Sequence, residues 1–134
     1  MSGGHTSAAL AQECTLLLFE VGGQVFAADP REVTRIDRFQ PFLPTLEILP
    51  TDSKRVLIAR SANGEFQVPV DSVRGVQQLP VSALRRPPAL AQAVAGARAA
   101  EVMGMVLLGA EPVLIVDMQA LSARQDGRAS SQGT

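Results

Sequence analysis

The chain has 134 residues, of which 46% are hydrophobic and 19% charged, and its formal net charge is −1. This composition is typical of a single soluble globular domain and differs from that of a disordered chain. A net charge so close to zero provides no basic footprint for nucleic acid. No stretch approaches the roughly 20 apolar residues of a membrane span, and residues 1–14 lack the basic start and apolar core of a signal peptide. We therefore expect a cytoplasmic protein.

Chemically reactive side chains are scarce. His5 is the only histidine and Cys14 the only cysteine, so we expect neither a disulfide within the chain nor a metal site. General acid–base catalysis by histidine has no candidate outside the polar N-terminal stretch. No glycine-rich phosphate-binding motif occurs in the chain, and we expect no cofactor.

The ordered chain begins with a predicted hairpin. The apolar run TLLLFEV at 15–21 is typical of a buried strand, and QVFAAD at 24–29 supplies its partner. Gly22 and Gly23 between them suit the positive φ angles of a tight turn. Before this hairpin, residues 1–14 are small and polar, and we expect them to be disordered.

A short helix is expected after the hairpin. Asp29 is a suitable N-cap and Pro30 suits the first helical position. A helix of about two turns would place Val33 and Ile36 on one face. The next stretch, FQPFLPTLEILPTDSK at 39–54, contains several prolines and predicts an extended connector with a short strand at TLEIL.

The second half of the chain predicts two more hairpins. RVLIARS and EFQVPV flank Asn63-Gly64, a strong hairpin signal, and DSVRGVQQL continues as a strand. LPVSALRRPP predicts a short 3₁₀ turn. Residues 89–102 are alanine-rich and fit either a helix or a loop. GMVLLG and PVLIVDM predict the last hairpin, and MQALS predicts a short helix or turn. Residues 123–134 are expected to be a disordered tail. Many short strands with few helices predict small antiparallel β-barrels.

Three aspartates lie at predicted strand ends, namely Asp29, Asp71 and Asp117. Asp71 and Asp117 could in principle share a proton for acid–base catalysis. The residues that follow them are Ser-Val and Met-Gln rather than the small residues of an aspartic protease, and Ser72 has no histidine to activate it. We therefore expect these carboxylates to accept hydrogen bonds from the backbone of the next turn, and we expect no enzyme. Exposed valines near strand edges could instead bind a partner, although each of them could equally be core.

Three segments in a fixed order resemble one family. LLLFEVGGQVFAADPREVTRI, FQVPVDSVRGVQQLPVSALRRPP and VMGMVLLGAEPVLIVDMQAL are similar to the opening hairpin and helix, the Val-Asp-x-Val turn region and the closing hairpin of the CheW family, the adaptors of bacterial chemosensory arrays. The resemblance covers residues 15–122 with one gap. It implies an all-β fold of two intertwined SH3-like barrels with one or two short helices and no catalysis.

The resemblance also implies partners and contact residues. Members of the family couple chemoreceptor cytoplasmic tips to the regulatory domain of a histidine kinase. The partner-binding positions implied for this chain are Val33, Arg35, Ile36, Val70, Val73 and Val76. Structural turn roles fall to Gly22, Gly23, Asp29, Asp71 and Asp117. A methyl-accepting chemoreceptor is the expected partner, and a CheA-type histidine kinase or another CheW-like protein is a further candidate; no nucleic acid and no membrane insertion are expected.

Two departures from the family pattern suggest a specialised member. The hairpin with an Asn-Leu-Arg-Gly turn that the family carries before its second barrel is absent, so the first subdomain is truncated. It is then either open at one edge or closed by the connector. Arg35 stands where many members have an acidic residue. The implied division is a truncated first subdomain with connector at 15–54, a second subdomain at 55–110 and a closing strand and helix at 111–122.

Three functions stay open on the sequence. The first is a CheW-like adaptor that binds chemoreceptor tips but binds the kinase weakly or not at all. The second is an ordinary coupling protein that bridges receptor and kinase. The third is a small-ligand-binding or enzymatic β-barrel domain.

Overall fold

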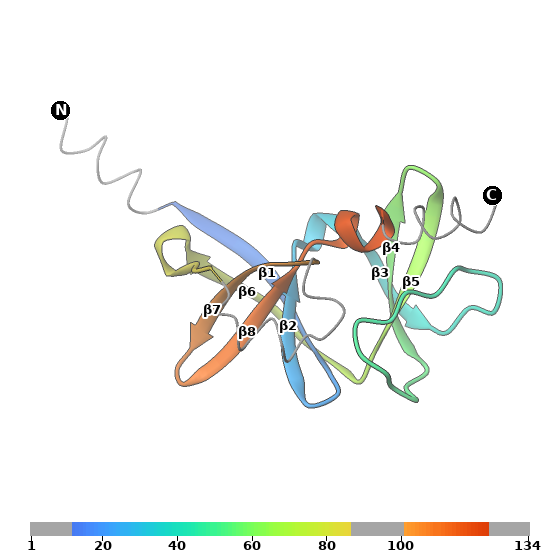
Figure 1. Ribbon diagram of the computed structural model, residues 1–134, viewed down its shortest axis with the longest axis horizontal. Helices are drawn as coiled ribbons and strands as arrows, with labels where there is room; N and C mark the ends of the chain where they lie inside the picture. Colours follow the sequence, from blue (N-terminus) through green and yellow to red (C-terminus); the bar gives the residue numbers. More distant parts are fainter. Residues whose placement is uncertain (1–11, 87–100, 124–134) are drawn as a thin grey trace.

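The computed structural model describes residues 12–86 and 101–123, and strands dominate both stretches (Figure 1). The strands are β1 (Glu13–Val21), β2 (Gln24–Ala28), β3 (Val33–Arg38), β4 (Arg55–Ser61), β5 (Gly64–Val70), β6 (Ser72–Pro80), β7 (Val102–Leu108) and β8 (Glu111–Val116). The 3₁₀ turns are η1 (Pro30–Glu32) and η2 (Val81–Ala83), and a helix covers 118–123. The all-β prediction is confirmed.

The strands form two sheets. One sheet has five strands in the order β6-β1-β2-β8-β7, and the other has three in the order β3-β4-β5. The two sheets lie beside each other, on the left and the right of Figure 1. The pairing of β2 with β8 is parallel, unlike the antiparallel arrangement expected throughout. This pairing joins the first hairpin of the chain to the last one. No local turn signal could have predicted it, because the two strands are far apart in the sequence.

A backbone bridge links the two edges of the five-stranded sheet. The N–H of Arg85, which follows β6 and η2, donates to the carbonyl of Met105 in β7 at 2.8 Å, and the Met105 N–H donates back to the Arg85 carbonyl at 2.8 Å. The chain after one edge strand therefore pairs with the opposite edge strand. Such closure protects strand edges that would otherwise be open to other chains.

Alternate residues of β1 belong to two hydrophobic cores, because side chains along a strand point to opposite faces. The central core, shared by both sheets, consists of Leu17, Phe19, Val21, Phe26, Ala28, Leu46, Ile48, Leu57, Ala59, Phe66, Val68, Val70, Val102, Leu114, Val116, Met118 and Leu121. The side core, within the five-stranded sheet, consists of Leu16, Leu18, Val25, Ala27, Leu79, Val106, Val113 and Ile115. The continuous apolar run in β1 thus reflects burial on both faces.

The predicted helix after the first hairpin is largely wrong. Asp29 does cap a helical turn, accepting a hydrogen bond from the Arg31 N–H at 2.9 Å, with Pro30 at its first position. The turn ends after three residues, however, and residues 33–38 form strand β3, which pairs with β4. Val33, Thr34 and Ile36 are β-branched, which favours the strand once a neighbouring strand is available.

The connector at 39–54 contains no strand, so the short strand expected at TLEIL is also wrong. Thr45 forms a single parallel bridge to Gln67 of β5. The side-chain amide of Gln67, which is fully buried, donates to the carbonyl oxygens of Gln40 at 2.7 Å and Leu43 at 3.2 Å and to the Thr45 hydroxyl at 2.9 Å. The connector therefore covers the β5 edge of the small sheet. Within the described residues, β3 pairs only with β4 and its other edge has no strand partner.

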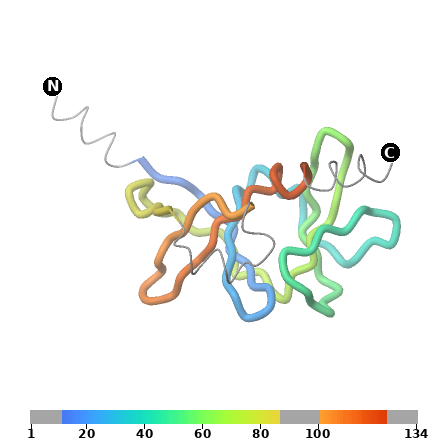
Figure 2. Tube along the Cα trace, viewed as in Figure 1, coloured from blue at the N-terminus to red at the C-terminus, as the bar shows by residue number. Residues whose placement is uncertain are grey.

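The remaining local predictions mostly hold. Gly22 and Gly23 in the first hairpin turn have positive φ, and so does Gly64, which is the first residue of β5 and follows the turn at 62–63. The 3₁₀ turn, the last hairpin and the final helix are present. In Figure 2 that helix, at 118–123, leads from β8 toward the three-stranded sheet, where the Gln119 side chain donates to the Arg60 carbonyl at 3.1 Å. Glu13 and Cys14, which were predicted to lie in the N-terminal tail, are part of strand β1.

Parts of the predicted organisation are left open. The tail residues 1–11 and 124–134, and most of the alanine-rich stretch 89–102, lie outside the described residues. The division of the chain at residue 54 stays a prediction. The small sheet spans that point, because β3 from one side of it pairs with β4 from the other.

Candidate partner-binding site

Strand β3 presents two of the predicted contact residues toward the central core. Residues directly opposite each other on paired strands share a face of the sheet. Val33 lies opposite Ala59, and Ile36 lies opposite Leu57, and both partners belong to the central core. Val33 is half-buried against that core, whereas Ile36 is 49% exposed. Ile36 is therefore an apolar side chain at the margin of the core.

Strand β6 has the same arrangement on the other sheet. Val73 lies opposite Phe19, and Val76 lies opposite Leu17. Val73 packs against the central core, whereas Val76 is 61% exposed. Val70, at the end of β5, has no exposed surface and cannot contact a partner directly. Of the five predicted aliphatic contacts, Ile36 and Val76 are the ones with substantial free surface.

Arg35 lies on the opposite face of β3 from these residues. It lies opposite Ile58, which is buried outside the central core. Its guanidinium pairs with the carboxylates of Asp37 at 3.2 Å and Glu65 at 3.1 Å. The pKa of Asp37 is lowered, chiefly by the hydrogen bond from the Arg38 backbone N–H and then by that from Arg35. Arg35 is thus separated from the apolar contacts by the thickness of the sheet.

A polar hollow of about 840 Å³ lies between β3 and the junction of β5 with β6. We call it the inter-sheet hollow. It is lined by Ile36, Asp37, Arg38, Ser53, Lys54, Arg55 and Asp71. It thus brings the predicted contact Ile36 next to the predicted turn residue Asp71. Its three cations were not among the predicted contact residues, although the adjacent Lys54 and Arg55 at the end of the connector were a visible signal.

Asp71 ties together three segments that are distant in the sequence. One carboxylate oxygen accepts from the Gly22 N–H at 2.8 Å, and the other accepts from the Thr51 hydroxyl. The Asp71 N–H donates to the Glu20 carbonyl at 2.7 Å. The sequence had suggested that this carboxylate accepts from the turn that follows it. It instead holds the β1–β2 turn and the connector. This hydrogen bonding fixes one wall of the inter-sheet hollow.

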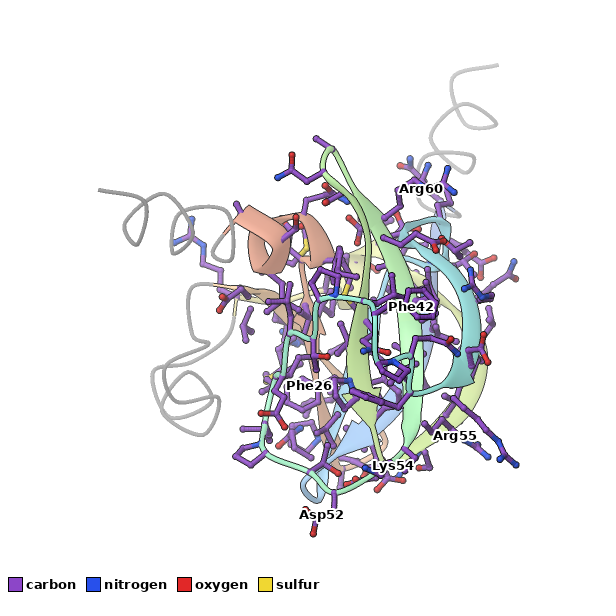
Figure 3. The ribbon with its side chains drawn as sticks, turned by 90° about the vertical axis from the view of Figure 1, so that its right-hand side faces the viewer. Phe26, Phe42, Asp52, Lys54, Arg55 and Arg60 are labelled. Atoms are coloured by element: carbon purple, nitrogen blue, oxygen red, sulfur yellow. The ribbon has the colours of Figure 1, made fainter. Side chains whose placement is uncertain are left out.

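Replacing Asp71 with alanine should lower the free energy of unfolding by about 1 kcal/mol, because two hydrogen bonds to an exposed carboxylate are lost. Urea denaturation of the purified chain measures this change. Asp52→Ala is the matched control, because this connector aspartate is exposed at the lower edge of Figure 3. Equal midpoints for both variants and the wild type would contradict the structural role of Asp71.

The other two aspartates cap short helical turns. Asp117 accepts from the backbone N–H groups of Gln119 at 2.9 Å and Ala120 at 3.2 Å, at the start of the helix at 118–123. Asp29 also pairs with the Arg31 guanidinium at 2.7 Å, and this hydrogen bond is the main cause of its lowered pKa. Asp71 and Asp117 therefore have separate backbone partners, and neither contact is that of a proton-sharing pair.

An apolar groove of about 970 Å³ lies at the opposite end of β1. Its exposed apolar residues are Val81, Leu84 and Met103. Glu32 also lines it, and burial raises the pKa of this carboxyl group, with the nearby Asp117 charge as a smaller cause. This groove was not predicted from the sequence, because the residue pattern around Met103 does not reveal which face of the strand is exposed.

Neither the inter-sheet hollow nor the apolar groove has the chemistry of a metal centre. No group of three or more histidine, cysteine or acidic residues that could hold a metal ion occurs within residues 12–86 and 101–123. In the same part of the chain, no helix has the length and apolar character needed to cross a bilayer. The surfaces available are apolar patches and charged rims, which are means of binding.

The fold and these surfaces define a class of small two-sheet β proteins that act by binding partners. Residues 42–126 match the family of CheW-like domains. The chain is 37% identical over 115 residues to the frizzy aggregation protein FrzB of Myxococcus xanthus, with 84% of this chain and 97% of that protein covered. The chain belongs to the CheW-like family, whose members are non-catalytic scaffold and adaptor proteins.

A solved structure supports the fold. The crystal structure of the scaffolding protein TtCheW from Thermoanaerobacter tengcongensis superimposes with a TM-score of 0.65 and 15% identity, covering 82% of this chain and 92% of that one. The resemblance noted in the sequence is therefore confirmed. Residues before 42, including the first hairpin and β3, lie outside the family match but within the described fold.

Proposed function

We propose that this CheW-like scaffold is a receptor-side adaptor that acts in the cytoplasm. It binds the cytoplasmic tip of a methyl-accepting chemoreceptor and binds a CheA-type histidine kinase weakly or not at all. Weak kinase binding is supported by the incomplete small sheet. The connector at 39–54 contains no strand, so the β3 edge of this sheet has no strand partner among the described residues. The relative from Myxococcus xanthus is covered over 97% of its length, so its overall length is close to that of this chain.

The receptor contact is assigned to the two exposed aliphatic residues that flank the central core. Ile36 and Val76 lie on different sheets but on the faces that carry this core. Apolar side chains at such a position can bury surface against a receptor helix without disturbing the fold. An ordinary coupling protein that bridges receptor and kinase is the alternative. The enzymatic alternative does not apply, since the family is non-catalytic.

Replacing Val76 or Ile36 with aspartate should weaken binding to a purified chemoreceptor cytoplasmic fragment by about ten-fold or more, which corresponds to about 1.4 kcal/mol. Isothermal titration calorimetry measures this change. Leu107→Asp is the matched control, because this leucine is 48% exposed on β7, in the five-stranded sheet. It should bind the fragment as the wild type does.

A second titration with the kinase regulatory domain separates the two functions. Receptor binding without measurable kinase binding supports the receptor-side adaptor. Kinase binding as tight as that of a full-length coupling protein would replace it with the ordinary coupling role. Wild-type protein that binds neither partner would remove both proposals.

A further inference from the structure

Three cationic side chains gather at one end of the β3–β4 pair. Arg38, the last residue of β3, lies directly opposite Arg55, the first residue of β4. Lys54 precedes Arg55, and its carbonyl accepts from the Phe39 N–H at 2.7 Å, which extends the pairing by one step. All three cations line the inter-sheet hollow. Figure 3 shows Lys54 and Arg55 at the lower end of the small sheet, with Arg60 at its upper end.

The facing arginines share the sheet face that carries the central core. Arg55 lies opposite Arg38 on one side and opposite Val70, a core residue, on the other. Two steps along β3, Ile36 lies opposite Leu57 on the same face. Positive charge therefore directly adjoins an exposed aliphatic side chain at the margin of the core.

This positive charge is not neutralised within the described part of the chain. Ion pairs occur there at Arg31, Arg35, Arg60 and Arg74, but none involves the three cations of the hollow. The Lys54 ammonium lies 5.6 Å from the centre of the Phe39 ring, which is an attraction but not a neutralisation. Like charges placed directly opposite on paired strands destabilise a sheet. The folded chain thus keeps an unfavourable pair at a surface hollow.

The two carboxylates in the hollow are engaged elsewhere. Asp37 accepts from Arg35 at 3.2 Å and from the Arg38 backbone N–H at 2.7 Å. Asp71 accepts from Gly22 and Thr51. An incoming anion would therefore meet side chains of Arg38, Lys54 and Arg55 that lack acidic partners in the described residues.

We propose that the inter-sheet hollow binds an extended acidic segment of a protein partner. Its carboxylates pair with Arg38, Lys54 and Arg55, an aliphatic side chain rests on Ile36, and its backbone adds to the free edge of β3. Charge complementarity favours this occupant, as does the edge of β3 that has no strand partner among the described residues. Nucleic acid is disfavoured, because the hollow also contains two carboxylates and the chain carries a net charge of −1. The inference rests on the proposed function in taking this face as the partner surface.

The test uses fluorescence anisotropy with the full chain and a labelled peptide of about eight residues in which serine alternates with either valine or glutamate, so that the valine and glutamate side chains share one face of the extended segment. We expect binding that weakens as sodium chloride is raised, and binding at least about ten-fold weaker for a matched valine–glutamine peptide. The double substitution Arg38→Gln/Arg55→Gln should abolish the preference for glutamate. Arg60→Gln is the matched control, since this exposed arginine lies at the other end of β4.

A stability readout separates a binding role from a structural one. Because the double substitution removes two facing like charges, its urea midpoint should equal or exceed that of the wild type while peptide binding is lost. Equal binding of the two peptides, unchanged binding by the double variant, or a lowered midpoint would overturn the inference. Full displacement of the peptide by inorganic phosphate or a single-stranded oligonucleotide, at an ionic strength where sodium chloride leaves the peptide bound, would overturn it as well.

The receptor fragment distinguishes this inference from the proposed function. Receptor binding that the double substitution leaves unchanged would overturn the inference and leave the proposed function standing. If the chain binds the glutamate peptide but not the receptor fragment, the proposed function is overturned and the inference about the hollow stands.

Discussion

Replacing Phe26 with alanine is expected to lower the free energy of unfolding by about 4 kcal/mol, the largest effect of any single change proposed for this chain. Phe26 has no exposed surface and lies in β2, between β1 and β8. Its ring stacks against that of Phe19 with 6.0 Å between the centroids. Its side chain points into the central core that both sheets share. The cavity would therefore weaken contacts between the sheets as well as within one of them.

Chemical denaturation followed by circular dichroism measures this loss. Phe42→Ala is the matched control, because this phenylalanine is 77% exposed, lies on the connector and is not part of the central core. The control should unfold within about 0.5 kcal/mol of the wild type. A loss below about 1 kcal/mol for Phe26→Ala would mean that the two sheets do not pack through this ring.

Replacing Gln67 with leucine is expected to lower the free energy of unfolding by about 3 kcal/mol. The side chain is fully buried, and its oxygen accepts from the Gln40 N–H at 2.8 Å while its nitrogen donates to three oxygens of the connector. Leucine has a similar size but cannot satisfy any of these groups. They would then be unpaired in a buried environment, which costs more than the loss of an exposed hydrogen bond.

Urea denaturation measures the stability change, and hydrogen exchange shows where it arises. The Gln40 amide should exchange faster in the variant, because it donates to the Gln67 side-chain oxygen that leucine lacks. The Leu46 amide, which donates to the backbone carbonyl of residue 67, should exchange faster only through loosening of the connector. Gln78→Leu is the matched control, because this glutamine is exposed on β6. Unchanged exchange at Gln40 would show that the connector is held to β5 by other contacts.

The connector links stability to the proposed site. Its two ends supply both rims of the inter-sheet hollow, since Arg38 precedes it and Lys54 ends it. Gln67 and Asp71 hold it from the side of β5. A variant that releases the connector should therefore weaken acidic-peptide binding even though it leaves every cation in place.

Elements defined by neighbouring residues could be predicted from the sequence. Gly22 and Gly23 in the first hairpin turn adopt the positive φ angles expected of them, and Asp29 with Pro30 begins a helical turn as predicted. The all-β class and the resemblance to the CheW-like family also followed from the sequence. These features depend on backbone preferences and on the order of short segments, which are local properties.

Features that depend on distant pairing could not be predicted. Residues 33–38 follow the helix-start signal at Asp29 and Pro30, yet they form a strand because they pair with β4. Asp71 bonds to Gly22, far earlier in the chain, rather than to its own turn. Val70 resembles the other candidate contacts in sequence but is buried, because both sheets meet around it.

The family resemblance, the hairpins and the lack of any histidine or cysteine after residue 14 can be read directly from the amino-acid sequence. The exposure of particular aliphatic residues and the grouping of three cations around one hollow depend instead on how the two sheets assemble. Arg38 and Arg55 are separated by the whole connector, and their opposition arises from the register of β3 on β4. Register is set by burial of one face of each strand against the rest of the fold, and that burial is a property of the assembled sheets.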